Sequence, residues 1–88
     1  MKHKQPEIDV VGTKRWYNSY GELHRLSGPA VIYKNGEKYW YQCDMRHRLD
    51  GPAVIHRNGK EVWYIEDKRV KPIPNIILQL RKKLLDEA

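Results

Sequence analysis

The sequence lacks most of the devices with which small proteins reinforce a thin core. Its 88 residues include one cysteine, Cys43, no phenylalanine and no run of 18 apolar residues. A single cysteine excludes an intramolecular disulfide and favours a reducing compartment, so we expect a cytoplasmic protein. The missing apolar run argues against a membrane-spanning helix, and residues 1–6 lack the apolar stretch of a secretion signal.

Motifs for catalysis are absent as well. There is no glycine-rich phosphate loop, no Gly-x-Ser-x-Gly elbow and no pair of carboxylates in an apolar context. A metal set can be imagined from Cys43, His47 and His56, but no second cysteine or carboxylate completes a zinc spacing. We therefore expect no catalytic residue, no metal and no cofactor, which means a protein that is not an enzyme.

What remains is a short basic chain with enough apolar residues for one thin core. Valine, isoleucine and leucine total 20 of the 88 residues, and three Trp and six Tyr supply the large rings. This length predicts one domain over residues 1–88. The net charge of +6 is spread along the chain and mixed with acids. A spread charge is weaker evidence for a nucleic-acid partner than one basic stripe would be.

An internal repeat of 23 residues is the strongest feature of the sequence. Most positions are identical when residues 24–41 are placed over residues 47–64. The segments read His24-Arg25-Leu26-Ser27-Gly28-Pro29-Ala30-Val31-Ile32-Tyr33-Lys34-Asn35-Gly36-Glu37-Lys38-Tyr39-Trp40-Tyr41 and His47-Arg48-Leu49-Asp50-Gly51-Pro52-Ala53-Val54-Ile55-His56-Arg57-Asn58-Gly59-Lys60-Glu61-Val62-Trp63-Tyr64. Trp16-Tyr17 begins the same pattern earlier, with one extra residue in the following loop. Periods of this length indicate stacked supersecondary units.

Each repeat unit has the pattern of a β-hairpin. Runs of β-branched and aromatic residues flank Asn35-Gly36 and Asn58-Gly59, and Asn-Gly favours a two-residue type I′ turn. Such a turn would place Ile32 opposite Tyr39, so that Ala30, Ile32, Tyr39 and Tyr41 would share one face, and Val31, Tyr33, Lys38 and Trp40 the other. Gly21, Asp44 and Asp67 fall at one repeat phase, which predicts a tight reversal between hairpins.

The pattern Trp-Tyr-x-x-Gly/Asp-x-x-His-Arg-x-Ser/Asp-Gly-Pro-Ala, followed by Asn-Gly-x-x-x-Trp-Tyr, resembles the MORN-repeat variant family over about residues 13–70. The resemblance implies a mainly β fold, a short array of antiparallel hairpins in a single twisted sheet. It also implies a binding scaffold, used for protein contacts or acidic lipid, with variants among immunity partners of toxins and viral proteins. Asp44 and Asp67 replace the usual Gly, and Arg69-Val70-Lys71-Pro72 departs from the pattern, which we interpret as the end of the array.

The C-terminal residues have a helical pattern. Pro72-Ile73-Pro74 ends the β pattern, and Asn75 is a suitable N-cap for an α-helix over residues 75–87. An apolar stripe on this helix contains Ile76, Ile77, Leu80 and Leu84, with Leu78 and Leu85 widening it. The stripe favours either a cap on the open end of the array or a homodimerisation element.

Binding is the function that these features predict. His24-Arg25 and His47-Arg48 recur with the repeat, which favours hydrogen bonds that anchor loops over ligand contact. Trp16, Trp40 and Trp63 are expected in the core, whereas tyrosines are expected at a surface, because Tyr and Arg are enriched at binding hot spots. The candidate partner-binding residues are Tyr17, Tyr39, Tyr41, Tyr64, Arg25, Arg48, Arg57 and Lys38.

We expect a small inhibitor or adaptor that binds a protein partner, phage-encoded or of the immunity type. One alternative is a nucleic-acid-binding protein, with Arg25, Arg48, Arg57 and several lysines on phosphates and tyrosine rings on bases. Another is attachment to acidic lipid through Arg81, Lys82 and Lys83 beside the apolar stripe of the helix.

Overall fold

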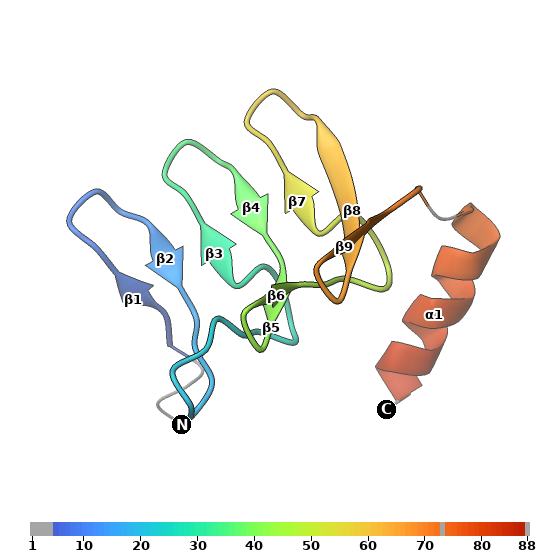
Figure 1. Ribbon diagram of the computed structural model, residues 1–88, viewed down its shortest axis with the longest axis horizontal. Helices are drawn as coiled ribbons and strands as arrows, with labels where there is room; N and C mark the ends of the chain where they lie inside the picture. The colour runs from blue at the N-terminus through green and yellow to red at the C-terminus, as the bar shows by residue number, and fades with distance from the viewer. Residues whose placement is uncertain (1–4, 73, 88) are drawn as a thin grey trace.

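The chain forms a row of β-hairpins with a helix at its C-terminal end (Figure 1). The computed structural model describes residues 5–72 and 74–87. The strands are β1 (Glu7–Ile8), β2 (Lys14–Arg15), β3 (Val31–Ile32), β4 (Lys38–Tyr39), β5 (Tyr41–Gln42), β6 (Met45–Arg46), β7 (Val54–Ile55), β8 (Glu61–Ile65) and β9 (Lys68–Val70). The helix α1 spans Asn75–Glu87. The predicted fold class, mainly β with stacked antiparallel hairpins and a C-terminal helix, is confirmed.

The hairpins lie side by side in one antiparallel sheet. Seven strands follow the order β1-β2-β3-β4-β7-β8-β9, and β5 and β6 form a separate two-stranded ribbon. The second strand of each hairpin pairs with the first strand of the next, as in the register Lys38↔Ile55 and Tyr39↔Val54. The sheet begins with β1, which precedes residue 13, where the repeat pattern of the sequence starts. Strands β1 and β2 form a first hairpin that is equivalent to the next two.

The predicted two-residue turns at the Asn-Gly pairs are wrong. Val31 faces Tyr39 and Ile32 faces Lys38, one residue away from the predicted register. The N–H of Gly36 donates to the carbonyl of Tyr33 (3.0 Å), and only Gly36 of the Asn-Gly pair has a positive φ, 96°. This is a three-residue loop, a type I turn closed by a left-handed glycine. The Asn35 side chain accepts a hydrogen bond from the N–H of Glu37 (3.0 Å), which holds this geometry.

The predicted assignment of side chains to faces is wrong for the same reason. A shift of one residue exchanges the faces of one strand relative to its partner. Tyr39 therefore shares its face with Val31 and Tyr33, and not with Ala30 and Ile32.

The predicted reversals at Gly21, Asp44 and Asp67 are confirmed, and the last two are type I′ turns. Cys43 and Asp44 have φ values of 50° and 63°, and Glu66 and Asp67 have 48° and 67°. Each pair connects strands in the register that a two-residue loop requires, Gln42↔Met45 and Ile65↔Lys68. The first reversal has the extra residue and uses a three-residue loop that ends at Gly21.

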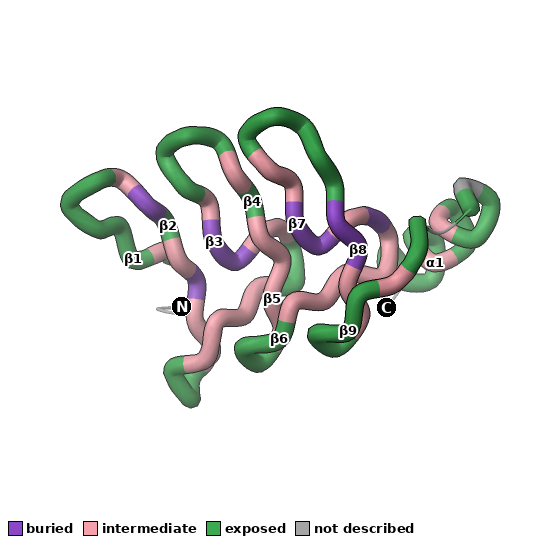
Figure 2. The backbone as a smooth tube through the Cα atoms, turned by 45° about the horizontal axis from the view of Figure 1, so that its top comes forward, coloured by how far each residue is buried: buried purple, intermediate pink, exposed green. Residues whose placement is uncertain are grey.

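The core is a narrow band through the middle of the sheet (Figure 2). The buried apolar residues are Trp16, Ala30, Val31, Ala53, Val54, Val62 and Trp63. Trp40, predicted with the other two tryptophans, is half-buried. No large side chain among those described is completely shielded from solvent. Stability therefore depends on contacts between neighbouring repeats rather than on one deep centre.

The helix stands at the end of the array with most of its apolar side chains in solvent. Its first turn is closed by the N–H groups of Ile77 and Leu78, which donate to the carbonyl of Pro74. Ile76, Ile77, Leu80 and Leu84, predicted as a cap or a dimerisation element, are all exposed. The predicted N-cap side chain of Asn75, and Ile73, lie outside the described positions. No helix of the described chain is both long and apolar enough to cross a membrane.

Candidate functional site

The repeated histidines join each repeat to the next through the turn backbone. The N–H of Cys43 donates to Nδ1 of His24 (3.1 Å), and the N–H of Glu66 donates to Nδ1 of His47 (3.0 Å). Both donors belong to turn residues with positive φ. The predicted role of the histidines in anchoring loops is therefore confirmed. The Cys43 thiol lies 3.8 Å from Nδ1 of His24, a nitrogen that already accepts the N–H of Cys43.

The repeated arginines are held inside the array. The Arg25 guanidinium lies 3.8 Å above the Trp16 ring centroid, and that of Arg48 lies 4.0 Å above the Trp40 ring centroid. Each Nη1 also donates to a proline carbonyl four residues ahead, Pro29 for Arg25 and Pro52 for Arg48. Burial lowers the pKa of Arg25. These cation–π contacts and hydrogen bonds assign both arginines a structural task.

The repeated Gly-Pro pair follows from this arrangement. A Cβ on Gly51 would lie 2.7 Å from Cζ of Arg48, and a Cβ on Gly28 would lie 3.3 Å from Cζ of Arg25. A side chain at residue 51 would therefore displace the Arg48 guanidinium, and one at residue 28 would fit only tightly beside Arg25. These glycines recur in the sequence repeat, and in the structure each allows the arginine side chain to pack closely against the backbone.

The two aspartates at the turn phase connect neighbouring turns. Oδ1 of Asp44 accepts the N–H of Leu23 (2.6 Å), and Oδ1 of Asp67 accepts both the N–H (3.2 Å) and Nε (2.6 Å) of Arg46. The Arg46 hydrogen bond lowers the pKa of Asp67. A glycine at this phase would allow the positive φ but could not form these bonds. The two aspartates thus connect neighbouring repeats through hydrogen bonds.

Aromatic rings gather on the face of the sheet that carries Tyr39. Tyr39 packs edge-on against Tyr33 (centroids 5.5 Å apart), stacks on Tyr41 (6.3 Å) and meets His56 edge-on (6.3 Å). The Arg46 guanidinium lies 4.1 Å above the Tyr64 ring. We define the tyrosine face by these residues: Tyr33, Tyr39, Tyr41, Arg46, His56 and Tyr64.

The tyrosine face combines packed rings with accessible polar groups. Tyr33 is 36% exposed, and Tyr39, Tyr41 and Tyr64 are half-buried. Burial raises the pKa of both Tyr39 and Tyr41, so these phenols stay neutral at physiological pH. No buried side-chain nitrogen or oxygen in the described part lacks a hydrogen-bond partner. Because the four phenol groups form no hydrogen bond within the described residues, they are not fully buried and can reach water or a ligand.

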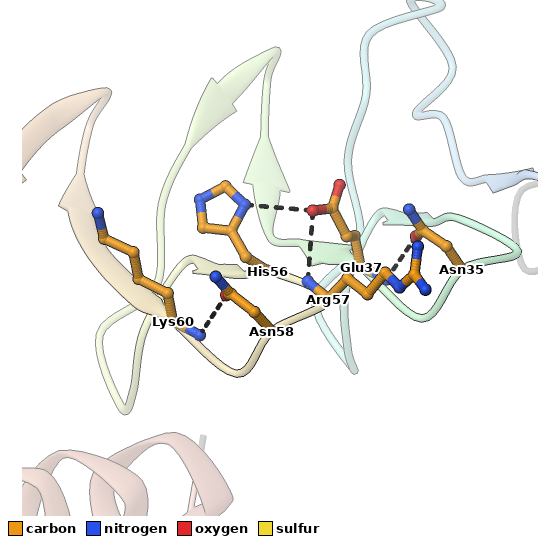
Figure 3. Close-up of polar contacts among 6 residues, drawn as sticks. All are labelled: Asn35, Glu37, His56, Arg57, Asn58 and Lys60. Atoms are coloured by element: carbon orange, nitrogen blue, oxygen red, sulfur yellow. Dashed lines mark hydrogen bonds and ion pairs between the residues drawn. The ribbon is translucent and has the colours of Figure 1, made fainter.

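A polar rim borders the tyrosine face where the hairpin tips meet (Figure 3). Oε2 of Glu37 lies 3.3 Å from Nδ1 of His56 and accepts the N–H of Arg57 at 3.3 Å. This carboxylate joins the second hairpin to the third. Arg57 and Lys60 beside it are exposed and line a shallow hollow with the pair. Lys38 is exposed and points from the opposite face, because its register partner is Ile32.

The structure divides the predicted partner-binding residues into separate places. Tyr39, Tyr41 and Tyr64 meet on the tyrosine face, whereas Tyr17 forms a β-bridge with Leu23 and lines a hollow beside Trp16. Arg25 and Arg48 lie against tryptophans on the other face. The prediction omitted Tyr33, His56 and Arg46. Tyr33 and His56 lie on the same face of the sheet as Tyr39. This placement follows only from the observed register and not from the predicted one.

Metal chemistry has no support among the residues that the structure describes. They contain no group of three or more His, Cys, Asp or Glu placed to hold an ion. The histidine beside the Cys43 thiol is His24, which does not belong to the imagined metal set.

Comparison with known proteins finds no matching family model, no matching curated protein and no matching solved structure. Function must therefore be inferred from the geometry of the chain itself.

Proposed function

We propose that this chain is a non-enzymatic protein-binding module, an inhibitor or adaptor, and that the tyrosine face is its contact surface. One observation carries the proposal: four tyrosines from two neighbouring repeats meet on one face, next to Arg46 and His56. Tyrosine and arginine are the residue types that dominate binding hot spots. The resemblance to the MORN-repeat variant family, which implies protein contacts, supports the same function.

The packing of these rings favours a preformed surface. Tyr39 is in contact with Tyr33, Tyr41 and His56, so its ring is held on several sides. A side chain that is already fixed loses little conformational entropy when a partner binds. The phenol hydroxyls can donate and accept hydrogen bonds at the edge of an apolar surface, which suits a mixed protein epitope.

Nucleic acid is the weaker candidate because the arginines that it needs are engaged elsewhere. Arg25 and Arg48 stack on tryptophans and donate to proline carbonyls. Arg57 and Lys60 remain exposed at the hairpin tips, but Glu37 lies between the tips and adds a negative charge. Phosphate binding favours an uninterrupted basic surface.

Affinity capture with matched variants tests the proposal. Tagged wild type, Tyr33→Ala and Tyr20→Ala are incubated with nuclease-treated lysate of the cells that express the protein, and captured proteins are measured by mass spectrometry. Tyr20 is the control because it is 87% exposed and lies outside the tyrosine face. We expect a protein captured by wild type and Tyr20→Ala and reduced about tenfold or more by Tyr33→Ala.

Two results would contradict the proposal. The first is a captured set that is the same for Tyr33→Ala and Tyr20→Ala. The second is capture that occurs only from a parallel lysate without nuclease treatment, which would favour nucleic acid. Circular dichroism of each variant shows whether the sheet is intact, so loss of folding is separated from loss of contact.

A further inference from the structure

Two equivalent leucines have different surroundings. Leu26 and Leu49 occupy the same phase of the repeat, one residue after Arg25 and Arg48. Leu49 is half-buried, and its carbonyl accepts a hydrogen bond from Nη1 of Arg81 in α1 (3.2 Å). Leu26 is 78% exposed. The helix of the chain thus donates a hydrogen bond to the second His-Arg-Leu loop, whereas the Leu26 side chain of the first loop is left in solvent.

Both loops border hollows built from the same residue types. One hollow, of about 750 Å³, lies between the two loops: Arg25 and Leu26 line one side, Trp40, Arg48 and Leu49 the other, and Leu85 and Asp86 of α1 border it. The other, of about 590 Å³, is lined by the equivalent residues Trp16, Arg25 and Leu26 without any residue of α1. Leu26 therefore lies at the hollow that α1 borders and also at a second, similar hollow that α1 does not reach.

The helix α1 has exposed apolar surface that could contact such a site. Five of its apolar side chains are between 40% and 69% exposed: Ile76, Ile77, Leu80, Leu84 and Leu85. Together they present on the order of 500 Å² of apolar surface, which is as large as the largest apolar patch of a typical monomer, a patch that is often functional. A stable interface buries about 800 Å² per partner, so this stripe with one loop surface approaches the needed area.

Charge distinguishes the uncovered site from the covered one. Nε of Arg48 forms an ion pair with Asp50 (3.1 Å), whereas the residue equivalent to Asp50 beside Arg25 is Ser27. No carboxylate within the described ranges lies at ion-pair distance from Arg25. Asp86 of α1 already lines the hollow that Arg25 and Arg48 share. The uncovered site therefore has a guanidinium suited to an acidic group at the end of a helix.

We propose that the surface around Leu26 binds α1 of a second copy of this chain. Neighbouring repeats are two strands apart, about 9.6 Å, and packed helices lie about 8 to 10 Å apart, so the two helices would also contact each other. The two copies are related by a two-fold axis, so both contacts are equivalent and the assembly is a closed dimer. Each helix then lies between Leu49 of its own chain and Leu26 of the other copy. In this dimer Asp86 of each copy faces Arg25 of the other.

The mass of the full-length chain in solution tests this proposal. Light scattering is measured on wild type, Leu26→Asp, Leu84→Asp and Val10→Asp over a range of concentrations. We expect about 21 kDa for wild type, twice the chain mass of 10.5 kDa. Leu26→Asp and Leu84→Asp should weaken dimerisation at least about tenfold. Val10, fully exposed on the first hairpin loop, is the control and should leave the dimer unchanged.

A further variant tests the charge contact. Ser27→Asp gives Arg25 the carboxylate that Arg48 has in Asp50, so Arg25 should attract Asp86 of the partner less. We expect dimerisation about two- to fivefold weaker with the fold intact. A monomeric wild type at all concentrations would overturn the proposal. So would a dimer that Leu84→Asp disrupts and Leu26→Asp does not, because the helices alone would then form the interface.

Discussion

At the scale of single residues, the repeated His, Arg, Gly and Asp serve the array itself. Arg48 touches the Trp40 ring, Asp50 and the carbonyl of Pro52, and Gly51 leaves room for its guanidinium. The sequence predicts loop anchoring for this phase because a residue that recurs in every unit fits a structural task. It cannot predict which ring each arginine covers, because that ring comes from the preceding repeat.

The glycines beside the arginines should differ in their sensitivity to a side chain. Gly51→Ala places Cβ 2.7 Å from Arg48 Cζ, and the guanidinium must leave its contacts, whereas Gly28→Ala creates a 3.3 Å contact that a small shift relieves. We expect Gly51→Ala to lower the free energy of unfolding by about 1 to 3 kcal/mol, and Gly28→Ala by less. Urea unfolding measures both. An equal loss would show that close packing is not the cause.

The two repeat histidines should share one tautomer. Nδ1 of His24 and of His47 accepts a backbone N–H, so in the neutral ring the proton must be on Nε2. Long-range ¹H–¹⁵N correlation spectra at pH 8 report the tautomer directly. We expect Nε2–H for both rings. A proton on Nδ1 of either ring would contradict the inter-repeat hydrogen bond at that site.

Asp67 should contribute to stability above its titration range and cease to do so in acid. Its folded-state pKa is lowered from 3.8 by the hydrogen bonds from Arg46, so the folded protein favours the ionised form. That contribution is present above about pH 4 and is lost as pH falls through the lowered folded pKa. The difference in urea midpoint between wild type and Asp67→Asn should therefore shrink from pH 6 to pH 2. A difference that stays constant would exclude this linkage.

At the scale of elements, turn chemistry explains both the success and the failure of the prediction. The sequence predicts a hairpin at Asn35-Gly36 and another at Asn58-Gly59. It does not predict the loop length, because an Asn-Gly pair is compatible with both a two-residue and a three-residue loop. The side chain of Asn35 bonds Glu37 and favours the longer loop, which moves Tyr39 onto the face of Tyr33. The tyrosine face could therefore not be assembled from periodicity alone.

The type I′ turn at Cys43-Asp44 leaves a strained residue that can be relieved. Cys43 has a φ of 50° without the side-chain chemistry that helps asparagine in this region. Cys43→Asn should raise the free energy of unfolding by about 0.5 to 1 kcal/mol in urea titrations. Lys34→Asn is the control, since Lys34 has no positive φ, and it should give no such gain. If both variants gain equally, relief of strain is not the reason.

At the scale of the whole molecule, the repeat predicts the architecture because each unit packs on its neighbours. The mainly β array and the C-terminal helix follow from a 23-residue period and from the stripe of Ile76, Leu80 and Leu84. The sequence does not predict what this stripe contacts, and in the single chain its side chains are exposed. The two faces of the sheet thus differ: the arginine–tryptophan stacks lie on one, and the tyrosine face, the proposed binding surface, lies on the other.

Photo-crosslinking from the tyrosine face tests the proposed binding surface most directly. Benzoylphenylalanine replaces Tyr33 in one variant and Tyr20 in another, because each substitution keeps an aromatic ring at its position. In the cells that express the protein, irradiation should give a discrete, nuclease-resistant protein adduct from position 33 and none from position 20. Adducts of equal yield from both positions, or from position 20 alone, would contradict a binding surface on the tyrosine face.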